Sequence, residues 1–440
     1  MTGVMRGHGI VAAVVSAIVA TELAAQQAPV VPQAPLQVTL QEAVRRALDV
    51  QPAMVQARGT QRNAGASGRS AWGAFLPTVT TSASAFRSNN ATFVPGDTSR
   101  LPPVYSYSGG LNANIVLFDG FSRFANLRVA SATADAAEAG FVNQRYQVAA
   151  TTAQVFFTAL ANEELVRVAQ AQVERARAEL QTAVNKFQAG AATRSDTLTA
   201  TVDLGNALLA ALQAQANLAT AEANLGRQIG VDQLVRAVPD SALPPLPDTT
   251  TLRASVLQAA PLVRQAEAQA SVTSAQLWST RGQYWPTVTL SYNNNRTGTQ
   301  SPQLPLLNNY PETFSWRFGL SWTLFNGFSR EQSQVAASVA HDVARAQAAD
   351  TRLQVNAQYT QQLAALFTSW AQIAIAGADV AAATEAVRVQ QERYRLGAGT
   401  LLDLLTAQAN LTQAAVSQVQ ARYTYLIARA QLEAIVGHTL

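Results

Sequence analysis

Large apolar residues occupy every second position between residues 314 and 324, with small or polar residues between them. Residues 111–117 and 288–292 show the same alternation. A period of two is typical of a β-strand whose two faces meet different surroundings. We expect two such strands in each half of the chain, joined by Pro-rich loops at residues 92–103 and 300–311.

The apolar positions change to a helical period after Gly120 and Gly327. The Ala-rich segments that follow, residues 121–188 and 328–395, contain no proline. Each therefore predicts one helix of about 100 Å, at about 1.5 Å per residue. One further helix is expected before the strands of each half, and Pro77 and Pro286 should end these two helices. The apolar positions of the first are Leu40, Val44, Leu48, Met54 and Val55, and those of the second are Leu252, Val256, Leu257 and Val263. Shorter helices are expected after the long ones, over residues 193–229 and 400–436.

The chain carries an internal repeat, which explains why every predicted element occurs twice. LFDGFSR at residues 117–123 recurs as LFNGFSR, and FQAGAATRSD at residues 187–196 recurs as YRLGAGTLLD, both 207 residues later. FLPTVT at residues 75–80 recurs as YWPTVT at almost the same offset. We therefore divide the chain into a signal peptide (1–25), a first repeat (26–230), a Pro-rich equatorial joint (231–250) and a second repeat (251–440).

Strands that alternate in this way, with aromatic residues near their ends, favour a transmembrane β-structure. The alternative is an amphipathic strand of a soluble sandwich, but the sequence predicts no further strands for a second sheet. Four strands are too few to close a barrel, and open edges are not tolerated in lipid. Several copies must then share one barrel around a rotation axis, continued by a tube of the long helices.

The order of elements, the two G-x-x-T-x-x-D turns, the LFDGFSR and LFNGFSR junctions and the closing ARYTYLIARAQLEAIVG resemble the TolC family of outer membrane efflux proteins. The resemblance extends over nearly everything after residue 25. It implies a mainly α protomer with transmembrane β-strands, three of which form a 12-stranded barrel and a long periplasmic helical barrel.

The resemblance also implies the function and the partners. The protein would be a passive exit duct for efflux or secretion in the outer membrane of a Gram-negative bacterium. It would work with a periplasmic adaptor protein and an inner-membrane transporter. The competing hypothesis is a structural or adhesive coiled-coil protein with a membrane anchor, which sustained heptads would favour. The Ala-rich, multi-faced long segments do not favour it.

The hairpin turns hold the candidate site residues. Gly190 and Gly397 stand where a helix ends in a left-handed residue. Thr193 and Thr400 are natural N-caps, and Asp196 and Asp403 lie three residues further on, as in a capping box. The resemblance gives these tips, formed by Gly190, Thr193, Asp196, Gly397 and Thr400, a second role in adaptor docking. It also places Asp403 in a ring of carboxylates at the periplasmic mouth, a role compatible with capping.

The second turn departs from the better-known family pattern. Gly399 stands where some members have a basic residue, and Thr406 where a second acidic residue follows. Tyr394, a further member of the expected gate cluster, is retained. We therefore expect a loose constriction rather than a gate locked by charged links.

Aromatic residues flank the first strand of each half, namely Trp72, Phe75, Trp278 and Trp285. They fit either an aromatic girdle at the membrane interface or packing at the junction of barrel and tube. Arg317 lies on the small-residue side of its strand, which we assign to the lumen.

Composition argues against other function classes. Only 13% of the residues are charged and the net charge is +4, without a basic cluster, so nucleic-acid binding is not indicated. The chain has no Cys and three scattered His, and it lacks a phosphate loop and a nucleophile elbow. We expect no enzyme activity, no cofactor and no metal site. Long apolar runs are absent after the first twenty residues, so no membrane-spanning helix is expected.

The N-terminus predicts export and the absence of a lipid anchor. Arg6, an apolar stretch over residues 9–20 and the small residues of Leu23-Ala24-Ala25 form a signal-peptide pattern, and no Cys is available for acylation. The mature protein should therefore start near Gln26 and carry no fatty acid. Intact-mass spectrometry of the outer-membrane fraction tests this, and a retained N-terminus or an acyl mass increment contradicts it.

Overall fold

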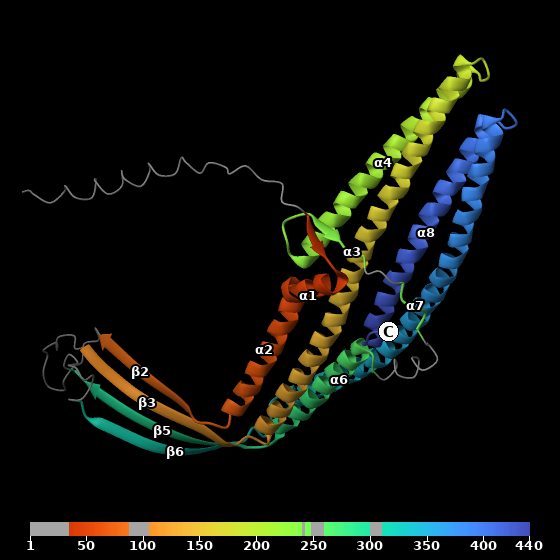
Figure 1. The fold of residues 1–440 in the computed structure, drawn as a ribbon. Helices are drawn as coiled ribbons and strands as arrows, with labels where there is room; N and C mark the ends of the chain where they lie inside the picture. The colour runs from red at the N-terminus through yellow and green to blue at the C-terminus, as the bar shows by residue number, and fades with distance from the viewer. Residues whose placement is uncertain (1–34, 88–104, 240–242, 248–258, 300–309) are drawn as a thin grey trace, which may run out of the picture.

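The computed structural model describes residues 35–87, 105–239, 243–247, 259–299 and 310–440. The expected signal peptide, most of both Pro-rich loops and the positions Leu252, Val256 and Leu257 lie outside these residues. The molecule is elongated, with a four-stranded sheet at one end and two helical hairpins at the other (Figure 1).

The sheet unites strands from both halves of the chain. Its strands are β2 (Thr78–Arg87), β3 (Tyr105–Phe118), β5 (Thr287–Gly298) and β6 (Glu312–Ser321), all antiparallel in the order β2-β3-β5-β6. The four predicted strands are confirmed. β6 ends at Ser321, before the predicted end at residue 324, because its partner β5 begins at Thr287, opposite Ser321.

The helical part follows the predicted order. The long helices α3 (Ser122–Gln188) and α7 (Ser329–Arg395) have 67 residues each, and α4 (Arg194–Ile229) and α8 (Leu401–Val436) have 36 each. All four predicted ranges are confirmed to within a residue. The remaining helices are α1 (Leu40–Val50), α2 (Pro52–Gly73), α6 (Pro261–Thr280) and the short 3₁₀ helix η1 (Arg281–Tyr284).

The helix expected before the first strand is interrupted. α1 and α2 are separated at Gln51, whose backbone is extended at φ −60° and ψ 130°. The cause is Pro52, which disfavours a helical conformation at the residue before it and then serves as the first residue of α2.

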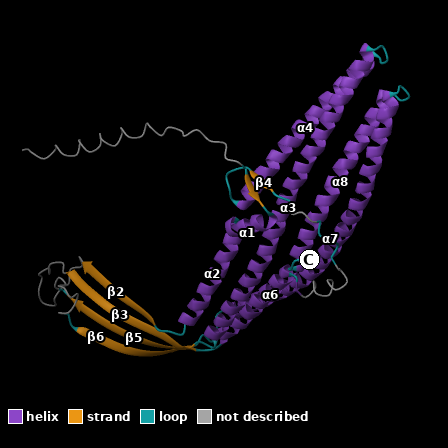
Figure 2. Ribbon diagram, viewed as in Figure 1, coloured by secondary structure: helices purple, strands orange, loops and turns teal. Residues whose placement is uncertain are grey.

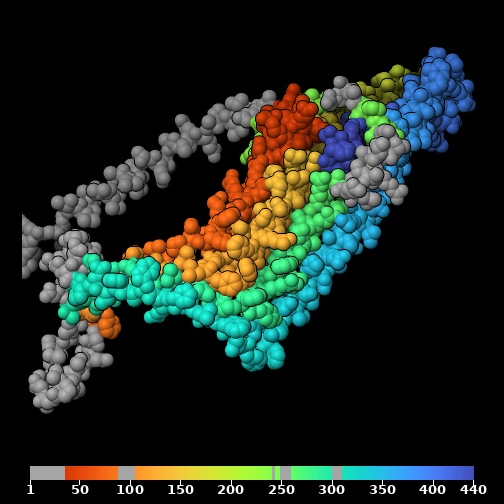
Figure 3. All heavy atoms as spheres, turned by 90° about the horizontal axis from the view of Figure 1, so that it is seen from below, coloured from red at the N-terminus to blue at the C-terminus, as the bar shows by residue number. Residues whose placement is uncertain are grey.

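The helices form a wall one helix thick. Next to the sheet the order across the wall is α2, α3, α6 and α7 (Figures 2 and 3). Towards the hairpin tips α4 pairs with α3, and α8 lies between α3 and α7. Small buried residues of α3, such as Ala169, Ala176 and Ala183, allow this close side-by-side packing.

By length and composition, α7 could cross a membrane, since it contains an 18-residue window with a mean hydropathy of 1.4. The expectation that no helix meets this criterion was wrong. Only 17% of that window is buried within the protomer. α7 lies at one edge of the wall, so apolar residues on its outer side, such as Phe367 and Ile375, are not covered by the rest of the described chain.

A small parallel sheet near the middle of the molecule was not predicted. β1 (Leu36–Val38) pairs with β4 (Val235–Ala237), which lies in the described part of the Pro-rich joint. The sheet packs on a buried cluster that includes Phe156, Leu225 and Ile229. A second contact attaches the joint to α8, because the Tyr425 hydroxyl donates hydrogen bonds to the carbonyls of Pro244 and Pro245, each at 3.0 Å.

The two strand-to-helix junctions have the same backbone conformation but differ in the space around their glycines. Gly120 and Phe121 have φ of 66° and 64°, and Gly327 and Phe328 have φ of 65° and 64°. A Cβ on Gly120 would lie 2.5 Å from both the Gly282 carbonyl oxygen and Trp285 Cβ, whereas a Cβ on Gly327 would meet nothing within 4 Å.

This difference predicts unequal effects of the same substitution. Gly327→Ala should cost about 1–2 kcal/mol, the strain of a left-handed non-glycine residue. Gly120→Ala should add about 1–3 kcal/mol for overpacking against a backbone carbonyl. Thermal unfolding of both variants in detergent measures the difference, and equal losses of stability would contradict the contact at Gly120.

Candidate functional site

The two hairpin turns lie side by side at the end of the molecule farthest from the sheet (Figure 1). Gly190 and Gly397 have φ of 73° and 77°. In the first turn the Ala191 amide donates to the Lys186 carbonyl at 2.8 Å, and in the second the Ala398 amide donates to the Arg393 carbonyl at 2.8 Å. The predicted left-handed glycines are confirmed at both positions.

Both predicted capping boxes are also confirmed. The Thr193 hydroxyl accepts from the Asp196 amide at 3.2 Å, and Asp196 Oδ2 accepts from the Thr193 amide at 2.8 Å. The corresponding distances between Thr400 and Asp403 are 3.1 and 3.2 Å. Each carboxylate thereby satisfies backbone donors at the first turn of a helix and meets the positive end of its dipole.

Asp403 combines this capping role with an exposed position. Hydrogen bonds from Thr400 and the nearby positive charge of Arg393 hold the pKa of Asp403 below its usual value, so the carboxylate is ionised. All its cap hydrogen bonds go to Oδ2, which leaves Oδ1 for a further cation or donor. Arg393 was missed by the sequence analysis, because it lies ten positions earlier and only the turn brings it close.

Gly399 and Thr406 bring no charge to Asp403. The Gly399 amide donates to the Arg393 carbonyl at 3.1 Å, and a Cβ there would lie 3.1 Å from Arg393 Cβ, so the turn favours glycine. The Thr406 hydroxyl donates to the Leu402 carbonyl of its own helix at 2.8 Å.

Tyr394 lies in the seam between the two hairpins and is only 6% exposed. It packs in a cluster with Ala183, Ala200, Leu401 and Leu404, which come from α3, α4 and α8. Lys186 Nζ lies 3.9 Å from the centre of the Tyr394 ring and donates to the Tyr394 carbonyl. Lys186 was also missed by the sequence analysis, and it links the first hairpin to the second through a cation–π contact and a hydrogen bond.

A buried carboxyl group lies close to this link. Glu179 of α3 is 4% exposed, and its Oε1 has no hydrogen-bond partner among the described residues. Burial raises the pKa of Glu179 from its usual 4.5 to about 7; the positive charge of Lys186 opposes the shift and the negative charge of Asp203 adds to it. Burial and the charge of Glu179 raise the pKa of Tyr394 in turn.

The aromatic residues at the other end of the helices are partly exposed. Trp72, Trp278 and Trp285 project from the junction of sheet and helices, and the Arg281 guanidinium lies 4.8 Å from the Trp278 ring centre. The Trp285 side chain also packs against Gly120. Both expected roles, interface girdle and junction packing, are compatible with these positions.

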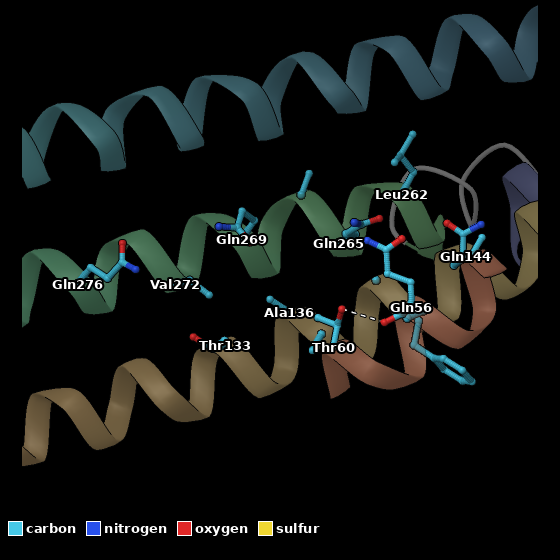
Figure 4. Close-up of a pocket in the computed structure, with 16 residues that line it drawn as sticks. Gln56, Thr60, Thr133, Ala136, Gln144, Leu262, Gln265, Gln269, Val272 and Gln276 are labelled. Atoms are coloured by element: carbon cyan, nitrogen blue, oxygen red, sulfur yellow. Dashed lines mark hydrogen bonds between the residues drawn. The ribbon is translucent and has the colours of Figure 1, made fainter. Parts of the chain in front are cut away.

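A cavity of about 760 Å³ lies between α2, α3 and α6. Its lining is formed by Gln, Ala and Thr side chains with a few larger apolar ones, and the glutamines of all three helices surround it (Figure 4). None of its lining residues is titratable. In the described ranges, His, Asp and Glu form no cluster of three or more that could hold a metal ion.

Comparisons with known proteins agree on one class. A family model described as outer membrane efflux protein matches residues 43–231 and 252–438. The outer membrane efflux protein BepC of Brucella suis biovar 1 (strain 1330) is 26% identical over 336 residues, which cover 72% of this chain and 69% of BepC.

Solved channel structures share the fold. The CmeC outer membrane channel of Campylobacter jejuni matches with a TM-score of 0.76 at 20% identity, covering 90% of this chain and 85% of CmeC. The outer membrane protein VceC of Vibrio cholerae matches with a TM-score of 0.75 at 17% identity, covering 91% of this chain and 96% of VceC.

Glu179 makes stability depend on pH. Between about pH 4.5 and 7 the folded protein holds a proton that the unfolded chain has released, so stability should fall as pH rises through this window. The full effect is about 3 kcal/mol. Glu179→Gln mimics the protonated form and should remove this part of the slope.

Thermal unfolding in detergent from pH 4.5 to 8 measures the slope. Glu174→Gln is the matched control, because Glu174 lies on the same helix with an exposed side chain paired to Arg177 at 3.0 Å. Identical pH slopes for the parent and the Glu179 variant would refute the assignment.

Proposed function

The chain belongs to the outer membrane efflux protein family, and from this premise we propose that three copies assemble into one continuous duct through the outer membrane and the periplasm. The protein is an exit duct for efflux in the outer membrane of a Gram-negative bacterium. The trimeric assembly is supported mainly by the two outer strands of the sheet, β2 and β6, each of which has an edge that no other described strand pairs with.

The sheet cannot exist alone in lipid. Phe314, Trp316, Phe318 and Leu320 of β6 are each 65–68% exposed, so this face of the strand is suited to hydrocarbon. Unpaired backbone N–H and C=O groups are not tolerated in hydrocarbon, so the edges of β2 and β6 must pair with neighbouring copies. Three copies give the 12 strands that the family resemblance implies.

The helical wall exposes apolar side chains at both of its edges near the tips. α4 buries Ala207 and Ala211 against α3 of its own hairpin and exposes larger apolar residues, namely Leu198, Val202, Leu209 and Leu212. α7, at the opposite edge, exposes Ile375 and Val389 in its half towards the tip. A helix of a soluble protein instead buries its large apolar residues and exposes polar ones. A neighbouring copy on each edge would cover the exposed apolar side chains.

The duct would be passive and would take its energy from a partner. We propose an inner-membrane transporter and a periplasmic adaptor that docks at the hairpin tips, with Gly190, Thr193, Asp196, Gly397 and Thr400 as contact points. No catalytic role is assigned to any residue. The adhesive coiled-coil alternative is not favoured, because the family match extends over both halves of the chain.

The hairpin tips would form the periplasmic mouth. Asp403 would contribute to a ring of carboxylates around the axis, and Tyr394, Gly399 and Thr406 would shape a constriction without charged locks. Opening would be a rigid-body movement of hairpins. We also propose that the chain is divided into a signal peptide (1–25), a first repeat (26–230), a Pro-rich joint (231–250) and a second repeat (251–440).

The assembly is directly testable. Because a monomer would leave both strand edges and both helical edges uncovered, the folded protein should be a homotrimer in detergent, with no stable folded monomer. Light scattering corrected for bound detergent gives the protein mass. A monodisperse folded monomer would refute the shared barrel.

The mouth predicts a cation-dependent block. Three carboxylates at a spacing of about 6 Å would repel by about 3 kcal/mol per pair at an effective dielectric of 20, so the ring should attract multivalent cations. Such cations, added from the periplasmic side, should block single-channel current in planar bilayers. Asp403→Ala should relieve the block.

Asp196→Ala is a closely matched control, since it removes an equivalent capping box at a cost on the order of 1 kcal/mol. It should leave the block largely unchanged. If the Asp403 variant is blocked as strongly as the parent, Asp403 is a helix cap only.

A further inference from the structure

The strand register sorts the side chains of the sheet onto two chemically different faces. Successive side chains alternate between faces, so residues paired across strands share a face. One face carries Val79, Leu111, Ile115, Leu290, Trp316 and Phe318 among its members. The opposite face carries Thr, Ser, Asn and Gly at nearly every position, for example Thr80, Asn112, Asn293 and Ser315. The first face suits lipid and the second suits a water-filled lumen.

Arg317 is the one charged residue on the polar face of the four described strands. It pairs with Ser291, which pairs with Asn114, so these residues lie in one row across the sheet. The other charged residues of the strands, Arg87, Arg296 and Glu312, lie on the apolar face, and Arg296 is paired with Glu312 at 2.9 Å. No carboxylate on the described polar face therefore neutralises Arg317.

The neighbours of Arg317 add hydrogen-bond donors. The Ser291 hydroxyl donates to Asn114 Oδ1 at 2.9 Å, which leaves the amide N–H groups of Asn114 free to face the lumen. Asn112 Nδ2 donates to Asn293 Oδ1, so the side-chain N–H groups of Asn293 are likewise free to face the lumen. A guanidinium stays charged at any physiological pH, and its planar donors match carboxylate and phosphate groups.

We propose that Arg317 is an anion-binding, selectivity-determining residue inside the barrel, where three copies form a positive belt that favours carboxylate, phosphate and sulfate groups. The inference rests on the proposed function, because a lumen exists only when neighbouring copies close the sheet. The belt acts independently of Asp403, since the long helices separate the two by about 100 Å and the screening length at 0.1 M salt is about 10 Å.

Reversal potentials in planar bilayers under a KCl gradient test the belt. The chloride-to-potassium permeability ratio should be about twofold lower in Arg317→Gln than in the parent at 0.1 M salt. The difference is the effect that three positive charges, screened by salt, have on ions in water. Arg317→Lys keeps the charge and should keep the ratio. Arg87→Gln removes a charge from the apolar face of the same sheet and should leave the ratio unchanged.

A measurement on the parent alone covers the case in which a variant does not assemble. The chloride preference should weaken as KCl is raised to 1 M, where the screening length is about 3 Å. Normal channel current with the same permeability ratio in the parent and in Arg317→Gln, or a parental ratio that is insensitive to salt, overturns the anion belt and leaves the duct intact. A folded parent that remains a monomer in detergent overturns the proposed function itself, because no lumen then exists.

Discussion

An open strand edge is costly in lipid, because its backbone N–H and C=O groups find no water there. This chain has two such edges, at β2 and β6, on a sheet too narrow to curl onto itself. The rest of the architecture follows from closing those edges with further copies. Rotational symmetry then extends to the helical wall, which is one helix thick and has apolar residues on its two edges, at α4 and α7.

A wall of this kind cannot be stabilised by one large core. The buried residues form several small clusters along the helices, and many of their members are alanines. Small side chains allow the helices to approach closely, so dispersion contacts spread along the full length replace a central core. The two 67-residue helices α3 and α7 hold this arrangement together, because each runs from the sheet to the tips. α3 packs against α2 and α6 near the sheet and against α4 and α8 near the tips, and α7 packs against α6 and then α8.

Features set by local sequence were predictable, whereas those that depend on distant contacts were not. The strands, the long helices and both capping boxes follow from periodicity and from residues at most three positions apart. β1 and β4 have three residues each and pair across about 200 positions, too short to show a pattern. The contact between Lys186 and Tyr394 joins residues 208 positions apart, and only the fold reveals that Glu179 is buried beside it.

The scarcity of charge gives the remaining charges their influence. A lining of Ser, Thr, Asn and Gln solvates a passing molecule without preference for its sign, so selectivity must come from the few ionised groups. Symmetry repeats each of them three times at one level of the duct. Arg317 in the strands and Asp403 at the tips carry opposite signs and lie too far apart to cancel, because salt screens them over about 10 Å. Glu179 differs in kind, since its burial between the hairpins couples its proton to helix packing rather than to the lumen. In the proposed trimer, Arg317 and Asp403 would therefore form two separate electrostatic zones along the duct, and Glu179 would form a pH-sensitive contact in its wall.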